Sequence, residues 1–239
     1  METSSLLFWW PRVRDVAVPK PKTVAVWAGW HTLAGLLDGK PLPEEVRVLV
    51  EAAAAHLGYP LFLRTDLASC KHEWSRTCYV QSPENLWRNL YRVVDGNGVY
   101  DLACEAIVLR QYIPLQHAFH AFWGMPVARE RRYFVRDGEV VCHHPYWPEE
   151  SIRFFRIEEP PEWRDALRAL NEEPPDEVEL LSGYARELAR VLPGAWSLDF
   201  ALGEDGRWYF IDAAEASRSW HPTCPACARL TAESSRATS

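Results

Sequence analysis

Two Asp-Gly pairs, each set between two short apolar runs, most strongly constrain the fold of this 239-residue chain. One is at residues 137 and 138, in "RRYFVRDGEVVCH", and the other at 205 and 206, in "SLDFALGEDGRWYFIDAAEA". An Asp-Gly pair accepts the positive φ angles of a tight turn between antiparallel strands. Each stretch therefore predicts a β-hairpin.

The second hairpin is predicted to bring two aspartates together. With a two-residue turn at Asp205 and Gly206, Asp199 on the first strand lies opposite Asp212 on the second. Their Cβ atoms would be roughly 4.5–5.5 Å apart, and two like charges at this distance destabilise a sheet unless a cation offsets them. A four-residue turn would keep both on one face, whereas an odd-length loop would separate them.

The same register divides the hairpin into an apolar face and an aspartate face. The apolar face is expected to carry Leu198, Phe200, Leu202, Tyr209 and Ile211, and the aspartate face Ser197, Ala201, Trp208 and Phe210. Acidic residues facing water are the plain alternative. Mg²⁺ prefers oxygen ligands and commonly takes one or two carboxylates together with substrate phosphates. We therefore treat Asp199, Asp212 and Glu215 as candidate ligands of a metal–nucleotide site.

Cationic side chains suited to phosphates occur earlier in the chain. Arg64 ends the predicted strand "PLFLR", and Lys71 lies in the polar loop after it. The chain has only four lysines among 26 basic residues, and Lys71 is the only one after residue 40. Its position suggests that a compact ammonium is needed there, with an ordinary surface lysine as the alternative. Glu130 and Arg132 share one face of a predicted strand, a pattern that a cross-strand ion pair would also produce.

The remaining segments predict an α+β protein with antiparallel sheets. Helical spacing of apolar residues predicts a helix in "PEEVRVLVEAAAAHL", ending at Gly58, and a second over residues 82–94, ending at "DGNG". A helix capped by Asp176 and Glu179 is expected before "PG" at 193 and 194. Strands are expected in "YPLFLRTD", "TCYVQ" and "EAIVLRQYI", and a short helix around "EWRDALRAL".

The order of "PLFLRTD" with Lys71, "EAIVLRQYI", "ERRYFVRDGEVV" and the final hairpin resembles the ATP-grasp fold, in particular the small ATP-grasp proteins of phages and bacteria. The resemblance covers about residues 58 to 220. It implies two α+β subdomains with antiparallel sheets that enclose the nucleotide. The expected organisation is a reduced N-terminal segment (1–58), a small subdomain (59–112), a large subdomain (113–222) and a C-terminal tail (223–239).

The resemblance also implies roles for individual residues. Arg64 and Lys71 would contact the phosphates of ATP, and Arg132 would lie near the transferred phosphoryl group. Asp199 and Asp212 would hold Mg²⁺. The hinge that receives adenine would consist of Arg110, Gln111, Tyr112 and Ile113.

Two further residues near the final hairpin are candidates for the site. The family's second metal motif is Glu-x-Asn, but here Asp212 is followed by two alanines, which makes Glu215 the candidate for the missing ligand. Arg218 is placed to meet an anionic substrate or an acyl phosphate, and pairing with Glu215 is its equally simple alternative.

The implied activity is that of an ATP- and Mg²⁺-dependent carboxylate–amine ligase that forms ADP. Its substrates would be a small molecule or peptide with a carboxylate and a nucleophilic acceptor. The chain lacks G-x-S-x-G, G-x-x-x-x-G-K-[ST], H-R-D and K-x-D-G motifs, which argues against serine hydrolases, P-loop proteins, protein kinases and lysine-adenylate ligases. The net charge of -7 argues against general nucleic-acid binding, and the lack of an export signal or membrane-length apolar run suggests a cytoplasmic protein.

The competing interpretation is a non-catalytic zinc- or nucleotide-binding interaction protein. Cys224 and Cys227 form a C-x-x-C pair, and "CHH" at 142–144 offers further ligands for a structural zinc. A single C-x-x-C pair is a weak signal for zinc by itself. Metal analysis and stabilisation by Mg²⁺–ATP would separate the two interpretations.

Overall fold

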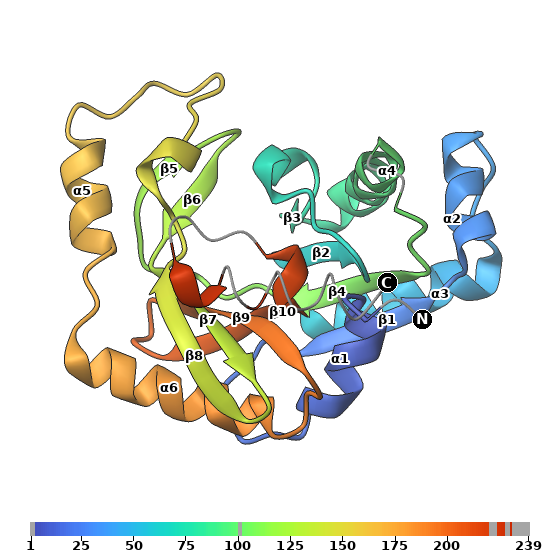
Figure 1. Cartoon of the computed structure of the whole chain (residues 1–239). Coiled ribbons are helices and arrows are strands. Elements are labelled where there is room, and N and C mark those ends of the chain that lie inside the picture. Colours follow the sequence, from blue (N-terminus) through green and yellow to red (C-terminus); the bar gives the residue numbers. More distant parts are fainter. Residues whose placement is uncertain (1–2, 100–101, 220–223, 228–229, 231–239) are drawn as a thin grey trace.

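Two four-stranded antiparallel sheets with helices packed against them make up most of the computed structural model, which describes residues 3–99, 102–219, 224–227 and 230 (Figure 1). The predicted α+β class with antiparallel sheets is confirmed. In the part of the chain that is described, none of the helices combines the length and the apolar character needed to cross a bilayer.

The first sheet has the strand order β1-β4-β2-β3. Its strands are β1 (Thr23–Trp27), β2 (Leu61–Thr65), β3 (Tyr79–Val80) and β4 (Ala106–Gln111), and its helices are α2 (Trp30–Leu37), α3 (Glu44–Leu57) and α4 (Pro83–Val99). Leu61 and Leu63 pack into an apolar core together with Val50 of α3 and Leu90 of α4. Since side chains alternate along a strand, Arg64 on β2 points to the opposite face of the sheet, away from this core.

Helix α4 continues through the "DGNG" segment that was expected to end it. Asn97 within that segment is buried, donates to the carbonyl of Val93 at 2.7 Å and lies 2.7 Å from the Thr65 hydroxyl. A Cβ on Gly96 would lie 2.6 Å from the sulfur of Cys70. The glycine is thus used for close packing against the loop after β2, and the expected helix end was wrong.

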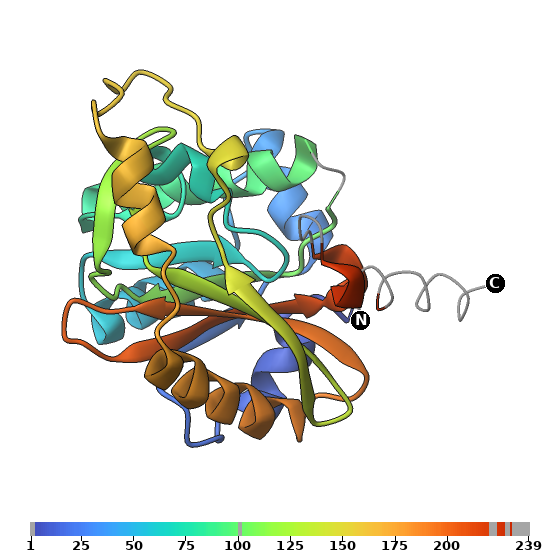
Figure 2. The ribbon, with the colours of Figure 1, turned by 60° about the vertical axis from the view of Figure 1, so that its left-hand side comes forward.

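The second sheet has the strand order β10-β9-β7-β8. Its strands are β7 (Glu130–Arg136), β8 (Glu139–Pro145), β9 (Ala195–Leu202) and β10 (Trp208–Glu215). Helices α6 (Pro175–Ala189) and α1 (Leu6–Val13) pack on one face of this sheet and share its core (Figure 2). The first Asp-Gly pair forms the β7–β8 turn, with φ angles of 50° at Asp137 and 89° at Gly138, so the predicted hairpin is confirmed.

The second hairpin also forms, with Asp199 opposite Asp212 as predicted, but its turn differs from the prediction. Five residues separate Leu202 from Trp208, and this odd-length loop alone would have separated the two aspartates. A bulge between Phe210 and Asp212 restores the pairing.

The bulge also corrects the predicted faces of β10. The structure pairs Phe200 with Phe210 and Leu202 with Trp208, and all four side chains belong to the core. Trp208 and Phe210 therefore do not share the face of the aspartates. The extra residue of the bulge allows β10 to place its aromatic side chains in the core and Asp212 on the opposite face.

The other elements form a smaller unit beside the second sheet. They are β5 (His117–Ala121), β6 (Met125–Ala128), α5 (Trp163–Leu170) and the short 3-10 helices η1 (Lys71–Arg76), η2 (Glu149–Ser151) and η3 (Ala216–Arg218). The β5–β6 hairpin was not predicted, whereas the helix at α5 was. Helix α6 begins at Pro175, after Pro174, without a side-chain cap, so the predicted capping box was wrong.

The first 58 residues take part in both sheets. They supply β1 and α3 to the first sheet, and α1 to the core of the second. The division at residues 58, 112 and 222 stays a prediction, and most of the predicted tail, 223–239, lies outside the described residues.

Trp9 on α1 should be a major source of stability for the second sheet. Its side chain is fully buried, and its ring meets that of Phe210 edge to face with centroids 5.6 Å apart. We expect Trp9→Ala to lower the free energy of unfolding by about 3–5 kcal/mol through lost packing and a cavity. Urea unfolding would show this as a lower midpoint with an unchanged slope. Trp27→Ala is the matched control, since Trp27 is 58% exposed and its loss should change stability by less than about 0.5 kcal/mol.

Candidate active site

A cavity of about 730 Å³ is lined by residues from both large sheets and from the loop after β2. Its lining includes nine of the predicted site residues: Arg64, Lys71, Arg110, Gln111, Tyr112, Ile113, Arg132, Asp199 and Asp212. Residues predicted from segments far apart in the sequence thus lie around one space.

Three charged residues form a row across adjacent strands of the second sheet. Arg132 on β7 pairs in register with Asp199 on β9, which in turn pairs with Asp212 on β10. The Arg132 guanidinium donates from Nε to Oδ1 and from Nη2 to Oδ2 of Asp199, each at 2.8 Å. Burial would lower the pKa of Arg132, but the Asp199 carboxylate outweighs it and raises the pKa above its ordinary value. The pair is therefore charged.

Arg64 reaches this row from the first sheet. Its Nη1 lies 2.8 Å from Oδ1 of Asp212, and the Arg64 side chain is only 5% exposed. The same guanidinium donates to the backbone carbonyls of Thr65, at 3.0 Å, and Leu67, at 3.4 Å. Each aspartate of the hairpin is therefore paired with an arginine, one from within its own sheet and one from across the cavity.

Arg110 is a buried cation that its neighbours neutralise only partly. It donates from Nε to the Thr23 hydroxyl at 3.1 Å and from Nη1 to the carbonyl of Ile211, while its buried Nη2 has no hydrogen-bond partner. Burial and, next, the nearby charge of Arg64 lower the pKa of Arg110 to about 10. A cation with an unused buried donor at a cavity wall is suited to an anionic ligand.

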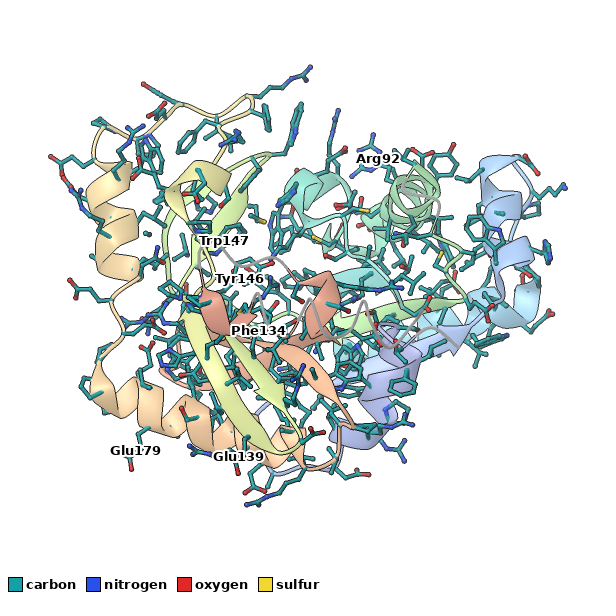
Figure 3. All side chains as sticks on the ribbon, in the orientation of Figure 1. Arg92, Phe134, Glu139, Tyr146, Trp147 and Glu179 are labelled. Atoms are coloured by element: carbon teal, nitrogen blue, oxygen red, sulfur yellow. The ribbon has the colours of Figure 1, made fainter. Side chains whose placement is uncertain are left out.

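Lys71 lies at the start of η1, in a pocket made by residues that sequence reasoning did not select. Its Nζ lies 3.7 Å from Oε2 of Glu130, 4.2 Å from the ring centre of Tyr146 and 4.8 Å from that of Trp147. Burial would lower the pKa of Lys71, but Glu130 outweighs it and raises the pKa. Figure 3 shows Tyr146 and Trp147 just past the end of β8, near the middle of the molecule, whereas Glu139 at the start of β8 lies at the periphery.

Glu130 is the residue of this group that the sequence pattern had indicated. It shares a strand face with Arg132 at a spacing of two, and both line the cavity. Burial raises its pKa more than Lys71 lowers it, and its Oε2 atom is buried without a hydrogen-bond partner. Tyr146 and Trp147 had no comparable signal, because they follow a strand and reach the cavity only through the tertiary fold.

The predicted hinge residues lie in a more apolar part of the same lining. Tyr112 meets Trp74 edge to face with ring centres 6.4 Å apart, and Phe62 lies 5.9 Å from Trp74. Gln111 ends β4, and Ile113 follows Tyr112 in the lining. The cavity thus joins a charged part to an aromatic part.

Glu215 and Arg218 are not among the residues that line the cavity. Three residues separate Glu215 from Asp212 along β10, and an odd separation places two side chains on opposite faces of a strand. Glu215 instead accepts a hydrogen bond from the Thr3 hydroxyl, and its Oε2 lies 3.7 Å from Nε of Arg218. The alternative interpretation of Arg218, a pair with Glu215, is the one that the structure shows.

The donor set around the cavity fits a magnesium–nucleotide complex. Asp199 and Asp212 offer carboxylate oxygens from directly opposite positions of two neighbouring strands, the ligand type that Mg²⁺ prefers. The unused Nη2 of Arg110 and the charges of Arg64 and Lys71 fit a polyphosphate.

Comparison with solved structures shows the fold. Cdc123 from Schizosaccharomyces pombe has a TM-score of 0.57 at 15% identity, over 98% of this chain and 90% of that one. The ATP-grasp ligase PsnB, complexed with a minimal precursor, has a TM-score of 0.50 at 15% identity, over 97% of this chain and 61% of that one. N5-carboxyaminoimidazole synthase from Aspergillus clavatus, in complex with ADP and 5-aminoimidazole ribonucleotide, has a TM-score of 0.50 at 13% identity, over 88% and 44%. The chain therefore spans about half to two thirds of the length of the last two proteins.

No curated protein matches the chain. A family model does, and it is described as an ATP-grasp domain, family 3 of its clade, with residues 38–233 matched. This range contains the cavity's predicted cations and both aspartates of the final hairpin. Since the match covers most of the sequence, the chain belongs to this ATP-grasp family and has the ATP-grasp fold.

Proposed function

We propose that this protein is an ATP- and Mg²⁺-dependent ligase that activates a carboxylate as an acyl phosphate for attack by an amine or a similar nucleophile. The observation that carries the proposal is the arrangement of the cavity, where four cations and three carboxylates face one space: Arg64, Lys71, Arg110, Arg132, Glu130, Asp199 and Asp212. No covalent nucleophile is needed for phosphoryl transfer, which depends on positioning and charge neutralisation.

The ion pairs of the cavity suggest how the nucleotide is received. Arg64 and Arg132 are paired with Asp212 and Asp199, so their charges balance before ligand enters. We infer that the arginines turn toward the phosphates when ATP binds and that the two aspartates are then available to Mg²⁺. Bound Mg²⁺ supplies Lewis-acid neutralisation of the phosphate oxygens. Arg110 and Lys71 complete the phosphate contacts, and adenine lies against the aromatic part near Tyr112.

The proposed reaction has two steps. An oxygen of the substrate carboxylate attacks the γ-phosphorus of ATP, the bond to the β,γ-bridging oxygen breaks, and ADP leaves. The amine then attacks the acyl carbon, inorganic phosphate leaves with the former carboxylate oxygen, and the amine loses a proton. In the first step Arg132 stabilises the negative charge on the transferred phosphoryl group, since it lies beside the aspartates proposed to hold the metal.

Two of the similar structures support this class of reaction. One is described as an ATP-grasp ligase with a precursor bound, and the other as a synthase in complex with ADP. Both share the fold at identities of 15% or less, so the acid and the acceptor of this protein do not follow from them.

Nucleotide binding can be tested by thermal unfolding with ATP, ADP and AMP-PNP, each with and without Mg²⁺. A ligand at 100 times its Kd stabilises a protein by about 2.7 kcal/mol, which for a chain of this size raises Tm by roughly 5–11 °C. We expect this shift with Mg²⁺–ATP and Mg²⁺–AMP-PNP. Without Mg²⁺ it should be much smaller, because Asp199 and Asp212 would repel the phosphates.

The acyl phosphate is tested separately by trapping. Hydroxylamine supplied with ATP, Mg²⁺ and a panel of carboxylic acids and peptides should yield a hydroxamate and ADP in equal amounts. No thermal shift with any nucleotide would contradict the proposed site. A shift accompanied by ATP hydrolysis without hydroxamate from any acid would contradict the ligase assignment.

A further inference from the structure

The strongest cluster of reactive side chains outside the cavity joins β8 to the segment near the C-terminus. Cys142 and His144 lie on β8, and Cys224 and Cys227 form the C-x-x-C pair. One ligand atom from each of the four lies within 4.8 Å of the other three. Figure 1 shows the short dark-red segment that contains Cys227 beside the end of β8.

The spacing of the ligand atoms suits a single tetrahedral metal ion. Zinc binds cysteine sulfur at about 2.3 Å and histidine nitrogen at about 2.0–2.1 Å, so two ligand atoms around it lie about 3.5–3.8 Å apart. Here Sγ of Cys142 lies 3.1 Å from Sγ of Cys227, which lies 4.0 Å from Nε2 of His144. Small rotations of these side chains would bring the four atoms to the required spacing.

The local sequence explains why these four side chains converge. Residues 142 and 144 are two apart on a strand, so both point to one face, while His143 points to the other face and contacts Glu173 at 2.9 Å. Cys224 and Cys227 come just before and within a helical turn, a spacing that lets two cysteines share one ion.

A metal at this position would have a structural task. The apolar cluster around it is small: Phe134, Ala216, Cys227 and Leu230 are buried, with Cys142, Ala195 and Cys224 packed against them. Such a cluster offers little burial to hold the segment after η3 against the sheet. β8 is the edge strand, and two residues after His144 it leads to Tyr146 in the cavity wall. A bound ion would fix both the segment and this edge.

We propose that Cys142, His144, Cys224 and Cys227 bind one structural Zn²⁺. Three thiolates and one imidazole fill all four positions of a tetrahedral zinc, and a site closed in this way is structural. The ion would lie outside the nucleotide cavity, because none of the four residues lines it. The proposal is therefore independent of the ligase assignment, and the zinc and ligase interpretations of the sequence do not exclude each other.

Metal analysis of the full chain, purified without chelators, tests the proposal. We expect one zinc per chain, and replacement by Co²⁺ should give the visible absorption of tetrahedral cobalt bound to thiolates. Cys224→Ser and His144→Gln should each lower the zinc content at least tenfold, as measured by competition with a chromophoric chelator. Because Cys224 is only partly buried, its variant should still fold.

Matched controls use a cysteine and a histidine outside the cluster. Cys104→Ala and His143→Gln should each keep one zinc per chain. Removal of zinc from the unaltered protein should lower Tm, and Cys224→Ser should show no further fall in Tm on chelation. Circular dichroism of each variant identifies any that fails to fold.

Four outcomes would overturn the proposal. One is a protein without zinc that takes up none on titration, and another is full zinc content in both ligand variants. The third is a count of four free thiols instead of six in the denatured, unreduced protein, which would indicate a disulfide between Cys142 and Cys227. The fourth is stoichiometric iron in place of zinc.

Discussion

Asp212→Asn is expected to lower the rate of ATP turnover by on the order of 10²- to 10³-fold. The amide keeps the size of the side chain but removes the charge with which Asp212 is proposed to hold Mg²⁺. The Mg²⁺-dependent part of the thermal shift with ATP should disappear in the same variant. Both quantities are measurable, as ADP release and as Tm with and without Mg²⁺.

The fold should survive this substitution. The Asp212 side chain is 40% exposed, and its partner Arg64 keeps the backbone carbonyls of Thr65 and Leu67 as acceptors. Asp38→Asn is the matched control, because the side chain of Asp38 is 70% exposed. Unchanged turnover and an unchanged Mg²⁺-dependent shift in Asp212→Asn would contradict the role of this residue.

The pairing of Asp199 with Asp212 was predicted correctly although the predicted turn was wrong. The turn has an odd number of residues, and the bulge before Asp212 compensates for it. Apolar alternation does not reveal a bulge, because the extra residue changes only which face the following side chains point to. The same bulge explains why Phe210 was assigned to the wrong face.

Residues that depend on tertiary packing were the hardest to predict. Trp9 and the strand β1 lie in a segment with no alternation or turn signal that would connect it to a sheet formed by later residues. Tyr146 follows a predicted strand and reaches Lys71 only because β8 ends at the cavity. By contrast, Arg64 and Lys71 stood out by local position and by the scarcity of lysine, and the fold brings both to the cavity.

The strand faces also separate reliable from unreliable site predictions. Glu130 and Arg132, two residues apart, both face the cavity as a period of two requires. Glu215 was selected for its chemistry and its nearness to Asp212 in sequence, and its face was not considered. A count of residues along the strand would have placed it on the opposite face.

Arg132→Met is expected to lower kcat for ADP formation by about 10³-fold or more, the range observed for arginines that stabilise a transferred phosphoryl group. The Kd of Mg²⁺–ATP should rise by less than about tenfold, because this stabilisation acts mainly in the transition state. Arg132→Lys should recover only part of kcat, since an ammonium cannot make the two parallel hydrogen bonds of a guanidinium. Arg207→Met, which removes an arginine that is 70% exposed on the β9–β10 turn, should leave kcat unchanged.

The loss of Arg132 also leaves Asp199 without its bidentate partner, and Asp199 is only 7% exposed. Removing one member of a buried ion pair costs about 3–5 kcal/mol, so stability must be measured alongside kcat. The double variant Arg132→Met/Asp199→Asn removes the unpaired charge and should recover stability in urea unfolding without recovering turnover. If Arg132→Met were folded and turned over ATP within tenfold of the unaltered protein, Arg132 would serve only to pair with Asp199, and its proposed contact with the phosphoryl group would be wrong.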